Sequence, residues 1–230
     1  MRRILAIGDI HGCSAALETL LAFVDLQPTD TLVTLGDYVD RGPDTRGVLD
    51  RLITLSRTHH LVALRGNHEL MLMDARVDRH ISLGEWRKFG GNATLDSYQG
   101  SLDRIPPAHW RFMEEQCVDC WENETHFFVH ANAYPDLPLY EQPRYILYWC
   151  RFNNPAPHES GKIMVCGHTS QKNGLPLNLG HAVCIDTWAC GEGGWLSCLD
   201  IHSGFVYQAN QEGETRRLRL GDLLVPSSER

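Results

Sequence analysis

Apolar and polar positions divide the first seventy residues into two kinds of segment. Three short apolar runs each lead directly into a polar turn that contains glycine: Ile4–Ile7, Thr31–Leu35 and Leu61–Leu64. The segments between them, Ala15–Val24 and Thr45–Leu55, carry leucine and valine at the spacing of one helix face. This β-α-β-α-β order predicts a parallel sheet with right-handed crossovers. The polar turns then lie together at the carboxyl edge of the sheet, where open α/β sheets bind ligands.

The rest of the chain predicts less regular structure. Residues 70–116 have a helical pattern that glycine and proline interrupt. Residues 131–162 are irregular and rich in proline and aromatic side chains, and we expect this loop to face the substrate. A hairpin is expected around Asn123 and Glu124. The further strand-like runs are 117–121, 126–129, 163–166, 182–185, 195–201 and 205–207.

The composition is that of an ordinary globular protein, with 43% hydrophobic and 22% charged residues in 230. We expect one domain over residues 1–230, with a core at about 3–208 and a C-terminal tail region at 209–230 whose last four residues are loose. The formal net charge of −8 disfavours a nucleic-acid partner bound through a broad basic surface.

Several sequence features predict a cytoplasmic location. The first apolar run is too short for a signal peptide, and no run reaches the ~18 apolar residues of a membrane span. The eight cysteines are scattered and predict reduced thiols, and the pair Cys117 and Cys120 is better explained by a strand than by a metal knuckle. We therefore expect a cytoplasmic protein without a membrane partner; the oligomeric state is left open.

The turns after the predicted strands carry side chains that bind metals. Carboxylate, imidazole and amide oxygen together suit divalent ions such as Mn²⁺, Fe²⁺ or Zn²⁺. Taken singly, Asp9 and Asp37 are equally explained as helix N-caps and Asn67 as a turn residue. Together, six such residues at six strand ends predict a metal site: Asp9, His11, Asp37, Asn67, His130 and His168.

Five motifs occur in a fixed order along the chain: GDIHG at 8–12, GDYVDRG at 36–42, GNHE at 66–69, HAN at 130–132 and GHT at 167–169. In this order they resemble the motifs of calcineurin-like metallophosphoesterases. Within that family they look most like the phosphoprotein phosphatase branch, and especially its compact bacterial and phage lambda-type serine/threonine phosphatases. The resemblance covers about residues 3–208. It implies an α/β fold in which a β-sandwich is flanked by helices in α/β/β/α layers, with the metal site at the carboxyl ends of strands.

The resemblance also implies a cofactor of two divalent metal ions, expected to be manganese, with iron or zinc as alternatives. Two ions ~3.5–4 Å apart can activate a water and hold the attacking and leaving oxygens of a phosphate ester. The family pattern assigns one ion to Asp9, His11 and Asp37, and the other to Asp37, Asn67, His130 and His168, so that Asp37 bridges them.

Four further residues take catalytic or phosphate-binding roles by the same resemblance. His68 is expected to be the general acid and Asp40 its carboxylate partner. Such a pair makes physical sense, because the carboxylate orients the imidazole and raises its pKa toward neutral pH. Arg41, together with Asn67, is expected to bind the phosphate, and so is Arg151, whose assignment rests on the short run Trp-Cys-Arg.

A few residues near the motifs carry expectations of their own. Asn132 and Trp188 stand where the family often has glycine, and the ring of Trp188 is expected beside the mouth of the site, where it would affect substrate range. Arg65 and Glu69 are expected to form structural ion pairs, with a supporting role at the metal site as the alternative for Glu69. Cys13 is expected to pack at the start of a helix.

The predicted activity is hydrolysis of phosphoserine and phosphothreonine in proteins or peptides, with phosphotyrosine and small phosphate esters as further substrates. The alternative is a symmetrical dinucleoside-tetraphosphate hydrolase. Those enzymes commonly replace the second aspartate of the GDxxDRG motif and carry GNHD, whereas Asp40 and Glu69 are present here. A nucleic-acid end-healing phosphatase is disfavoured by the acidic balance. A non-catalytic scaffold would be expected to lose ligands that this chain retains.

Overall fold

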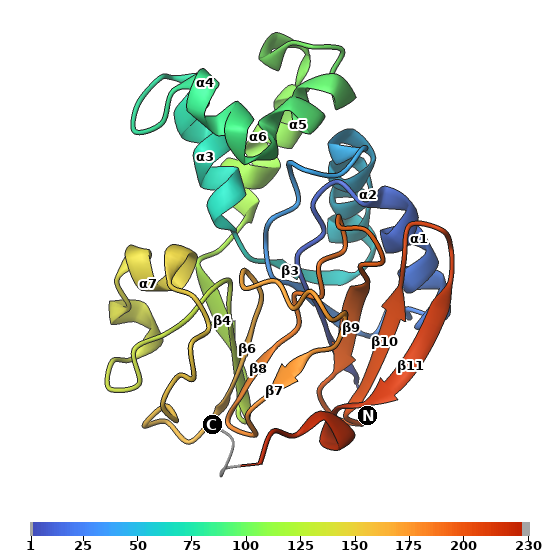
Figure 1. Cartoon of the computed structure of the whole chain (residues 1–230), viewed down its shortest axis with the longest axis vertical. Helices are drawn as coiled ribbons and strands as arrows, with labels where there is room; N and C mark the ends of the chain where they lie inside the picture. The colour runs from blue at the N-terminus through green and yellow to red at the C-terminus, as the bar shows by residue number, and fades with distance from the viewer. Residues whose placement is uncertain (1, 227–230) are drawn as a thin grey trace.

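The computed structural model describes residues 2–226 (Figure 1). Its helices are α1 (Ser14–Phe23), α2 (Thr45–Thr58), α3 (Asn67–Arg76), α4 (Leu83–Trp86), α5 (Asn92–Ser97), α6 (Pro107–Arg111) and α7 (Arg144–Trp149). Its strands are β1 (Ile4–Ile7), β2 (Thr31–Thr34), β3 (His60–Ala63), β4 (Cys120–Glu122), β5 (His126–Val129), β6 (Ile163–Cys166), β7 (Leu177–Asn178), β8 (Ala182–Cys184), β9 (Leu196–Asp200), β10 (Phe205–Ala209) and β11 (Thr215–Arg219).

The first sheet has six strands in the order β11-β10-β9-β1-β2-β3. Strands β1, β2 and β3 are parallel, and Leu5, Leu32 and Leu61 stand side by side across them. The predicted β-α-β-α-β unit is therefore confirmed. The other three strands are antiparallel, because β9 pairs with β1 in the opposite direction and β10 and β11 follow as hairpins.

The second sheet has five strands in the order β4-β5-β6-β8-β7, with β5, β6 and β8 parallel. The two sheets pack face to face through an apolar layer that includes Ala6 and Val33 from one sheet and Phe128, Val165 and Val183 from the other. Alternate residues of each strand point away from this layer toward helices. This arrangement confirms the predicted β-sandwich flanked by helices.

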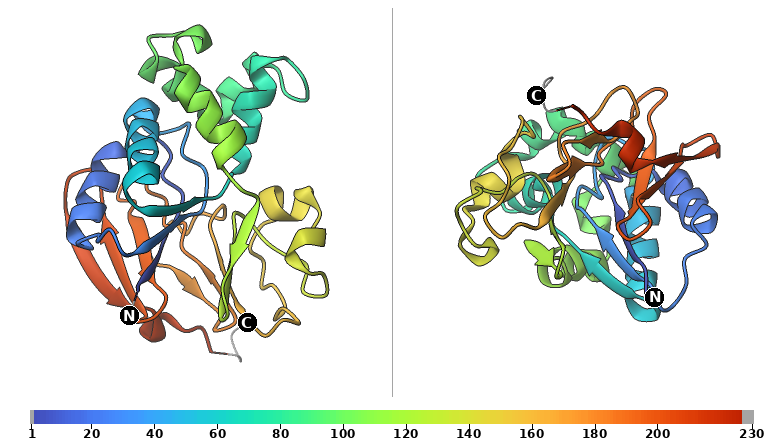
Figure 2. Two further views of the ribbon diagram at one scale, coloured as in Figure 1. Left: turned by 180° about the vertical axis from the view of Figure 1, so that it is seen from behind. Right: turned by 90° about the horizontal axis from the view of Figure 1, so that it is seen from below.

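Helices cover the outer face of each sheet (Figure 2). Leu5 and Ile7 point from β1 into a cluster with the apolar faces of α1 and α2. On the other side, Phe127 and Val129 of β5 pack against α7. The layers are therefore helix, sheet, sheet and helix, and the carboxyl ends of the parallel strands of both sheets meet at one end of the sandwich.

A separate group of helices stands at that end, drawn in green at the top of Figure 1. We call residues 70–116 the helical cap. It contains most of α3, then α4, α5 and α6, together with the kinked segment η1 (Arg87–Gly91) and the π-helical turn η3 (Phe112–Gln116). Gly90 has a φ of 111°, which breaks the helix between α4 and α5. The predicted glycine-interrupted helical segment is confirmed.

Three details differ from the sequence predictions. Residues 209–230 are not simply a tail, because Ala209 ends β10 and β11 adds an edge strand to the first sheet. Residues 131–162 are not wholly irregular, because α7 begins directly after Pro143, where proline suits the first turn of a helix. The hairpin strand predicted at 117–121 begins at Cys120.

Two further sequence predictions concern the C-terminal residues and membrane-spanning helices. The loose end predicted for the last four residues lies outside the described residues. Within residues 2–226, no helix has the length and apolar character needed to cross a lipid bilayer.

Candidate metal centre

The predicted ligands lie at the carboxyl ends of neighbouring strands. Asp9 and His11 follow β1, Asp37 follows β2, Asn67 opens α3 after β3, and His130 and His168 follow β5 and β6. All are buried except His168, which is half-buried. The backbone at His11, Asp37 and His168 has a φ between 44° and 64°, a left-handed conformation that is uncommon for residues other than glycine. Such conformations persist where the surrounding structure enforces them, often at functional sites.

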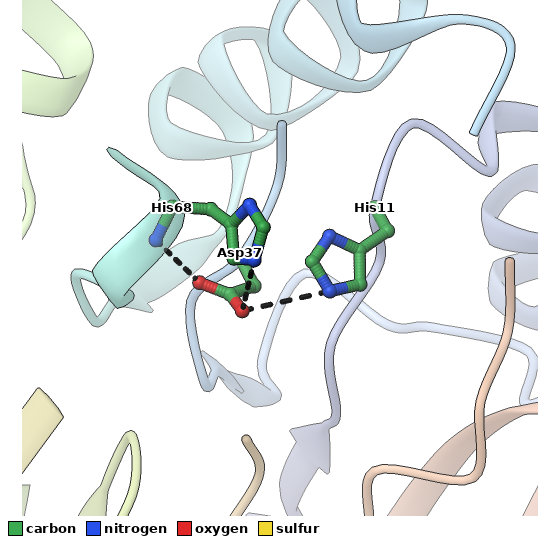
Figure 3. A group of neighbouring side chains, drawn as sticks. All are labelled: His11, Asp37 and His68. Carbon is green, nitrogen blue, oxygen red and sulfur yellow. Dashed lines mark hydrogen bonds and ion pairs between the residues drawn. The ribbon is translucent and has the colours of Figure 1, made fainter. Parts of the chain in front are cut away.

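Asp37 lies at the centre of the site (Figure 3). Its Oδ2 is 3.5 Å from His11 Nε2, and its Oδ1 is 3.5 Å from His130 Nε2. Its Oδ1 also accepts the backbone N–H of His68 at 3.0 Å. Burial alone would raise the pKa of Asp37, but the imidazoles around it, His130 first, lower that pKa below the ordinary range. Asp37 is therefore ionised, and its two oxygens face two different groups of histidines.

The first group is His11, Asp37 and His68, and the second is Asp37, His130 and His168; in each, the potential ligand atoms lie within 4.8 Å of one another. Asn67 completes the second group, because its Oδ1 is 2.9 Å from His130 Nε2 and 3.0 Å from His168 Nδ1. Four of the other five predicted ligands thus converge on Asp37.

The remaining predicted ligand, Asp9, lies beside these groups. Its carboxylate oxygens accept the backbone N–H of His168 at 3.0 and 3.1 Å. Burial raises the pKa of Asp9, and so do the nearby charges of Asp186 and Asp37. Asp186 was not predicted from the sequence; it is buried and accepts Ser170 Oγ–H at 2.7 Å. A cation is the group that would favour the charged form of these crowded carboxylates.

The histidine tautomers give a second reason why this site fits cations. His11 Nδ1 lies 2.9 Å from the carbonyl of Val39, and His130 Nδ1 lies 2.8 Å from the carbonyl of Leu35. A carbonyl only accepts, so each Nδ1 carries a proton, and the neutral form of each ring would turn the lone pair of Nε2 into the site. For His130 that lone pair faces the Asn67 oxygen, which is also an acceptor. A metal ion between such groups resolves the conflict.

The pKa values of two histidines support the same conclusion. Burial lowers the pKa of His11 well below its ordinary value. Burial lowers the pKa of His168 to about 4. Neutral imidazole is the form that binds metals. The residues present therefore fit a pair of divalent cations, with carboxylate, imidazole and amide oxygen as donors.

His68 differs from these histidines. Its Nδ1 lies 2.7 Å from Asp40 Oδ2, and both side chains are buried. Burial alone would lower the pKa of His68, but the charge of Asp37 and the hydrogen bond and charge of Asp40 raise it above the ordinary value. His68 is thus the histidine of the site that is set to hold a proton. Its Nε2 is 4.0 Å from Asp37 Oδ2 and points into the cluster.

Arg41 lies at the opening of the site and is the only predicted phosphate-binding arginine that contacts it among the described residues. Its Nη1 is 2.8 Å from His11 Nε2, and its Nη2 is 2.9 Å from His68 Nε2. The guanidinium is exposed on its other side. By contrast, the guanidinium of Arg151 is exposed and makes no hydrogen bond or ion pair with residues 2–226. The carbonyl of Arg151 accepts hydrogen bonds from Asn132 Nδ2 at 3.1 Å and from the backbone N–H of Asn153 at 2.9 Å.

Glu69 has a role that the expected ion pair does not describe. Its carboxylate accepts the backbone N–H groups of Asp37, Tyr38 and Val39 at 2.9, 2.7 and 3.2 Å, and that of Gly66 at 2.8 Å. The ion-pair prediction is therefore wrong for Glu69, which shapes the loop that carries Asp37. For Arg65 it is confirmed, since Arg65 Nη1 lies 3.1 Å from Asp119 Oδ1.

Two other expectations can be placed in the structure. Trp188 is half-buried; its backbone N–H donates to Asp186 Oδ1 at 3.0 Å, and its ring lies 5.4 Å from Lys172 Nζ. Cys13 is buried at the N-cap of α1, as predicted. Sequence reasoning missed Trp86 and Thr94, both of which bind Asp40. The acidic residue at the third position of α3 was a signal for Glu69, because that position often reaches back to a helix start.

The β-sandwich, the motif loops and the cation-fitting cluster together are typical of metallophosphoesterases. The chain belongs to the calcineurin-like phosphoesterase family, whose sequence model matches residues 2–178. It is 41% identical over 145 residues to serine/threonine-protein phosphatase 1 of Salmonella typhimurium, covering 58% of this chain and 60% of that protein. It is 36% identical over 130 residues to the symmetrical bis(5'-nucleosyl)-tetraphosphatase of Ralstonia nicotianae, covering 56% and 42%.

The chain thus spans about three fifths of the first relative and about two fifths of the second. Among solved structures, a candidate diadenosine tetraphosphatase aligns over 94% of this chain and 93% of its own, with a TM-score of 0.69 and 21% identity. That likeness concerns the fold. Phosphoester hydrolysis with divalent metals is the activity shared by the family, and the relatives carry names for two different substrates.

Proposed function

We propose that this chain is a phosphomonoesterase that hydrolyses phosphoserine and phosphothreonine in proteins or peptides, and small phosphate esters as well. The observation that carries the proposal is the His68–Asp40 pair beside the Asp37 cluster. An alkoxide such as that of serine is a poor leaving group, and a positioned acid speeds its departure. The resemblance of the five motifs to phosphoprotein phosphatases supports the same substrate class.

The proposed cofactor is a pair of manganese ions. When bound, two such ions would activate a water, stabilise charge on the phosphate and offset the carboxylates around them. One ion is assigned to Asp9, His11 and Asp37, and the other to Asp37, Asn67, His130 and His168. His68 lies close enough to His11 and Asp37 to be a ligand of the first ion. Its pKa is raised, however, whereas the pKa values of His11 and His168 are lowered. We therefore assign His68 to proton transfer.

The remaining residues act on the substrate directly. The proton leaves His68 at Nε2 once Arg41 Nη2, which lies 2.9 Å from that nitrogen, has turned to the phosphate, and Asp40 holds the ring by its other nitrogen. The fork of Arg41 faces the same space and suits two phosphate oxygens. Asn67 lies beside them with an amide that can also bind phosphate. Arg151 stays a proposed phosphate ligand that would have to turn inward to reach this space.

The second candidate is a symmetrical dinucleoside tetraphosphatase, favoured by the identity to the Ralstonia relative that carries this name. Such a substrate leaves as a nucleotide, whose phosphate is a better leaving group than an alkoxide and depends less on an acid. The presence of Asp40 and Glu69 favours the monoesterase. A cytoplasmic location and the absence of membrane and nucleic-acid partners belong to the same proposal.

One comparison of rates separates the candidates. The chain is loaded with Mn²⁺ and given a set of phosphoserine and phosphothreonine peptides, and in parallel diadenosine tetraphosphate. We expect kcat/KM at least about tenfold higher for the peptides, and complete loss with a chelator. The reverse preference would assign the chain to the second candidate. Turnover of neither substrate would remove both.

A further inference from the structure

Asp40 has more partners than its role beside His68 requires. Its Oδ2 accepts His68 Nδ1–H at 2.7 Å and Trp86 Nε1–H at 2.9 Å, and its Oδ1 accepts Thr94 Oγ1–H at 2.7 Å. Asp40 is fully buried, and so are Trp86 and Thr94. Both of these partners belong to the helical cap. A buried carboxylate with three charge-assisted hydrogen bonds can adopt one orientation only.

The Thr94 hydroxyl uses all of its hydrogen-bonding positions, and this fixes the direction in which its proton points. It accepts the backbone N–H of Asp40 at 2.8 Å and donates its one proton to the carboxylate of the same residue. Thr45 Oγ1 lies 3.1 Å away and must then be the donor in that contact. A hydroxyl has one proton and two lone pairs, so every hydrogen-bonding site of Thr94 is used. Backbone and side chain of Asp40 are thus both held by one cap residue.

The backbone of the helical cap comes close to the loop that carries Asp40 and Arg41. Asp40 and Arg41 have φ values of 71° and 69°, and the N–H of Arg41 donates to the carbonyl of Gly90 at 3.1 Å. A Cβ on Gly90 would lie 2.6 Å from Arg41 Cγ, and one on Gly91 would lie 2.4 Å from the ring of Trp86. The kink at Gly90 therefore brings two glycines close to the residues that the cap supports.

We propose that Trp86 and Thr94 are positioning residues of the proton-transfer step: the helical cap holds Asp40, and Asp40 holds the His68 ring with Nε2 toward the leaving oxygen. The inference rests on the proposed function. The assignment concerns orientation, since neither residue faces the metal cluster. It gives the cap a part in the chemistry beyond covering one end of the sandwich.

The test uses near-isosteric variants and two substrates of the Mn²⁺-loaded protein. Thr94→Val and Trp86→Phe each remove one hydrogen bond to Asp40, and Thr94→Ser keeps the hydroxyl. Tyr98→Phe is the matched control, because Tyr98 is buried in the same cap and bonds His109 at 2.7 Å, away from Asp40. An alkyl phosphate needs a proton donor at its leaving oxygen, whereas p-nitrophenyl phosphate leaves as a stable anion.

We expect Thr94→Val and Trp86→Phe to lower kcat on the alkyl phosphate about tenfold, with p-nitrophenyl phosphate changed less than about threefold. Thr94→Ser and Tyr98→Phe should stay within about twofold of the parent on both esters. The affinity for Mn²⁺, measured by calorimetry, should not change in any variant. Equal losses on both esters, or equal losses in Tyr98→Phe, would mean a merely structural role and would overturn the inference.

A second readout does not depend on activity. In Zn²⁺-loaded protein, the Nδ1 proton of His68 bonded to a carboxylate should give a low-field proton resonance, absent in His68→Asn. We expect it to be lost or shifted in Thr94→Val and unchanged in Tyr98→Phe. A parent protein inactive on both esters would contradict the proposed function, and this resonance would still decide the positioning role. A resonance that is unchanged in Thr94→Val would overturn that role.

Discussion

The strand-end loops and the helical cap serve the same site by different means. The loops after β1, β2, β5 and β6, with the start of α3, carry all six proposed metal ligands on the ends of paired strands. The cap carries none of the six. Instead it supplies two donors to the Asp40 carboxylate, an acceptor to the Asp40 backbone N–H and a carbonyl to Arg41. Metal binding and proton transfer therefore depend on different parts of the chain, and mutations should separate them.

The largest effect is expected inside the loops. Asp37→Ala removes the one carboxylate that faces both histidine groups. We expect loss of both metal ions and a fall in kcat/KM of about 10³-fold or more, which corresponds to about 4 kcal/mol of transition-state stabilisation. Metal content by mass spectrometry and turnover of p-nitrophenyl phosphate measure the two losses.

Asp103→Asn is the control, because it removes an exposed carboxylate of the cap. A variant Asp37→Ala that still bound two ions would refute the bridging position of Asp37. It would also remove the main reason to treat the two histidine groups as one centre.

A smaller effect is expected where the two regions meet. His68→Asn removes the proton donor but leaves the loops and their ligands intact. Turnover of an alkyl phosphate should fall about 10²- to 10³-fold, while the metal content stays at the parent level. The loss should be clearly smaller for p-nitrophenyl phosphate, measured under the same conditions.

His109→Asn provides the comparison for this variant. His109 is equally buried, and it bonds Tyr98 and Asp50 within and below the cap. It should lower stability without a preference between the two esters. If His68→Asn kept full turnover of the alkyl phosphate, the proton donor would have to be another group.

A change inside the cap should have a still smaller and selective effect. Gly91→Ala is compatible with the backbone, whose φ is −61°, but its Cβ would press on the Trp86 ring. We expect a stability loss of about 1–3 kcal/mol, a several-fold loss of alkyl phosphate turnover and unchanged metal affinity. Chemical denaturation and the two-ester assay report these separately.

Gly36→Ala is the matching change in a loop. Gly36 has a φ of 98°, and its Cβ would lie 2.5 Å from the backbone nitrogen of Gly66. A backbone atom cannot move aside as easily as the end of a side chain. We therefore expect Gly36→Ala to weaken metal binding as well as stability. The same phenotype in both glycine variants would show that cap and loops cannot be separated.

The loops were predictable because each is local. A short apolar strand and the glycine turn after it place Asp9 or Asp37 without reference to distant residues, and parallel pairing then brings the turns together. The same holds for His130 and His168 after their strands. In the first seventy residues, the sequence predicted the three parallel strands, and the structure places the four predicted ligands of this region just after them.

The cap contacts were not predictable in this way. Trp86 and Thr94 reach Asp40 across 46 and 54 positions of the chain, and their placement depends on the kink at Gly90, whose φ is 111°. Helical periodicity carries no information about such a kink. Strand β11 was missed for a different reason: four of its five residues are polar, and it is held by backbone pairing to β10 with Leu218 as its single apolar residue.

The smallest effect is expected outside both regions, at the beginning of β2. Arg3 Nη2 lies 2.5 Å from Asp30 Oδ2, and Gln27 N–H donates to the same oxygen at 2.9 Å. Burial alone would raise the pKa of Asp30, but these hydrogen bonds and the charge of Arg3 lower it. A lowered pKa means that the ion pair stabilises the fold above the unfolded-state pKa near ~4, and that this contribution is lost as the pH falls through the folded-state value.

Asp30→Asn should therefore cost about 1 kcal/mol at pH 7, or about 2–4 °C in Tm, and the difference from the parent should shrink toward zero near pH ~3. Thermal melts over this pH range give both numbers. Metal affinity at pH 7 should stay within about twofold of the parent. Only the four residues of β2 and the turn after it separate Asp30 from Asp37, so this is a demanding test. A clear loss of metal affinity would mean that the loops depend on the far end of their strands, and the independence assigned to them here would fail.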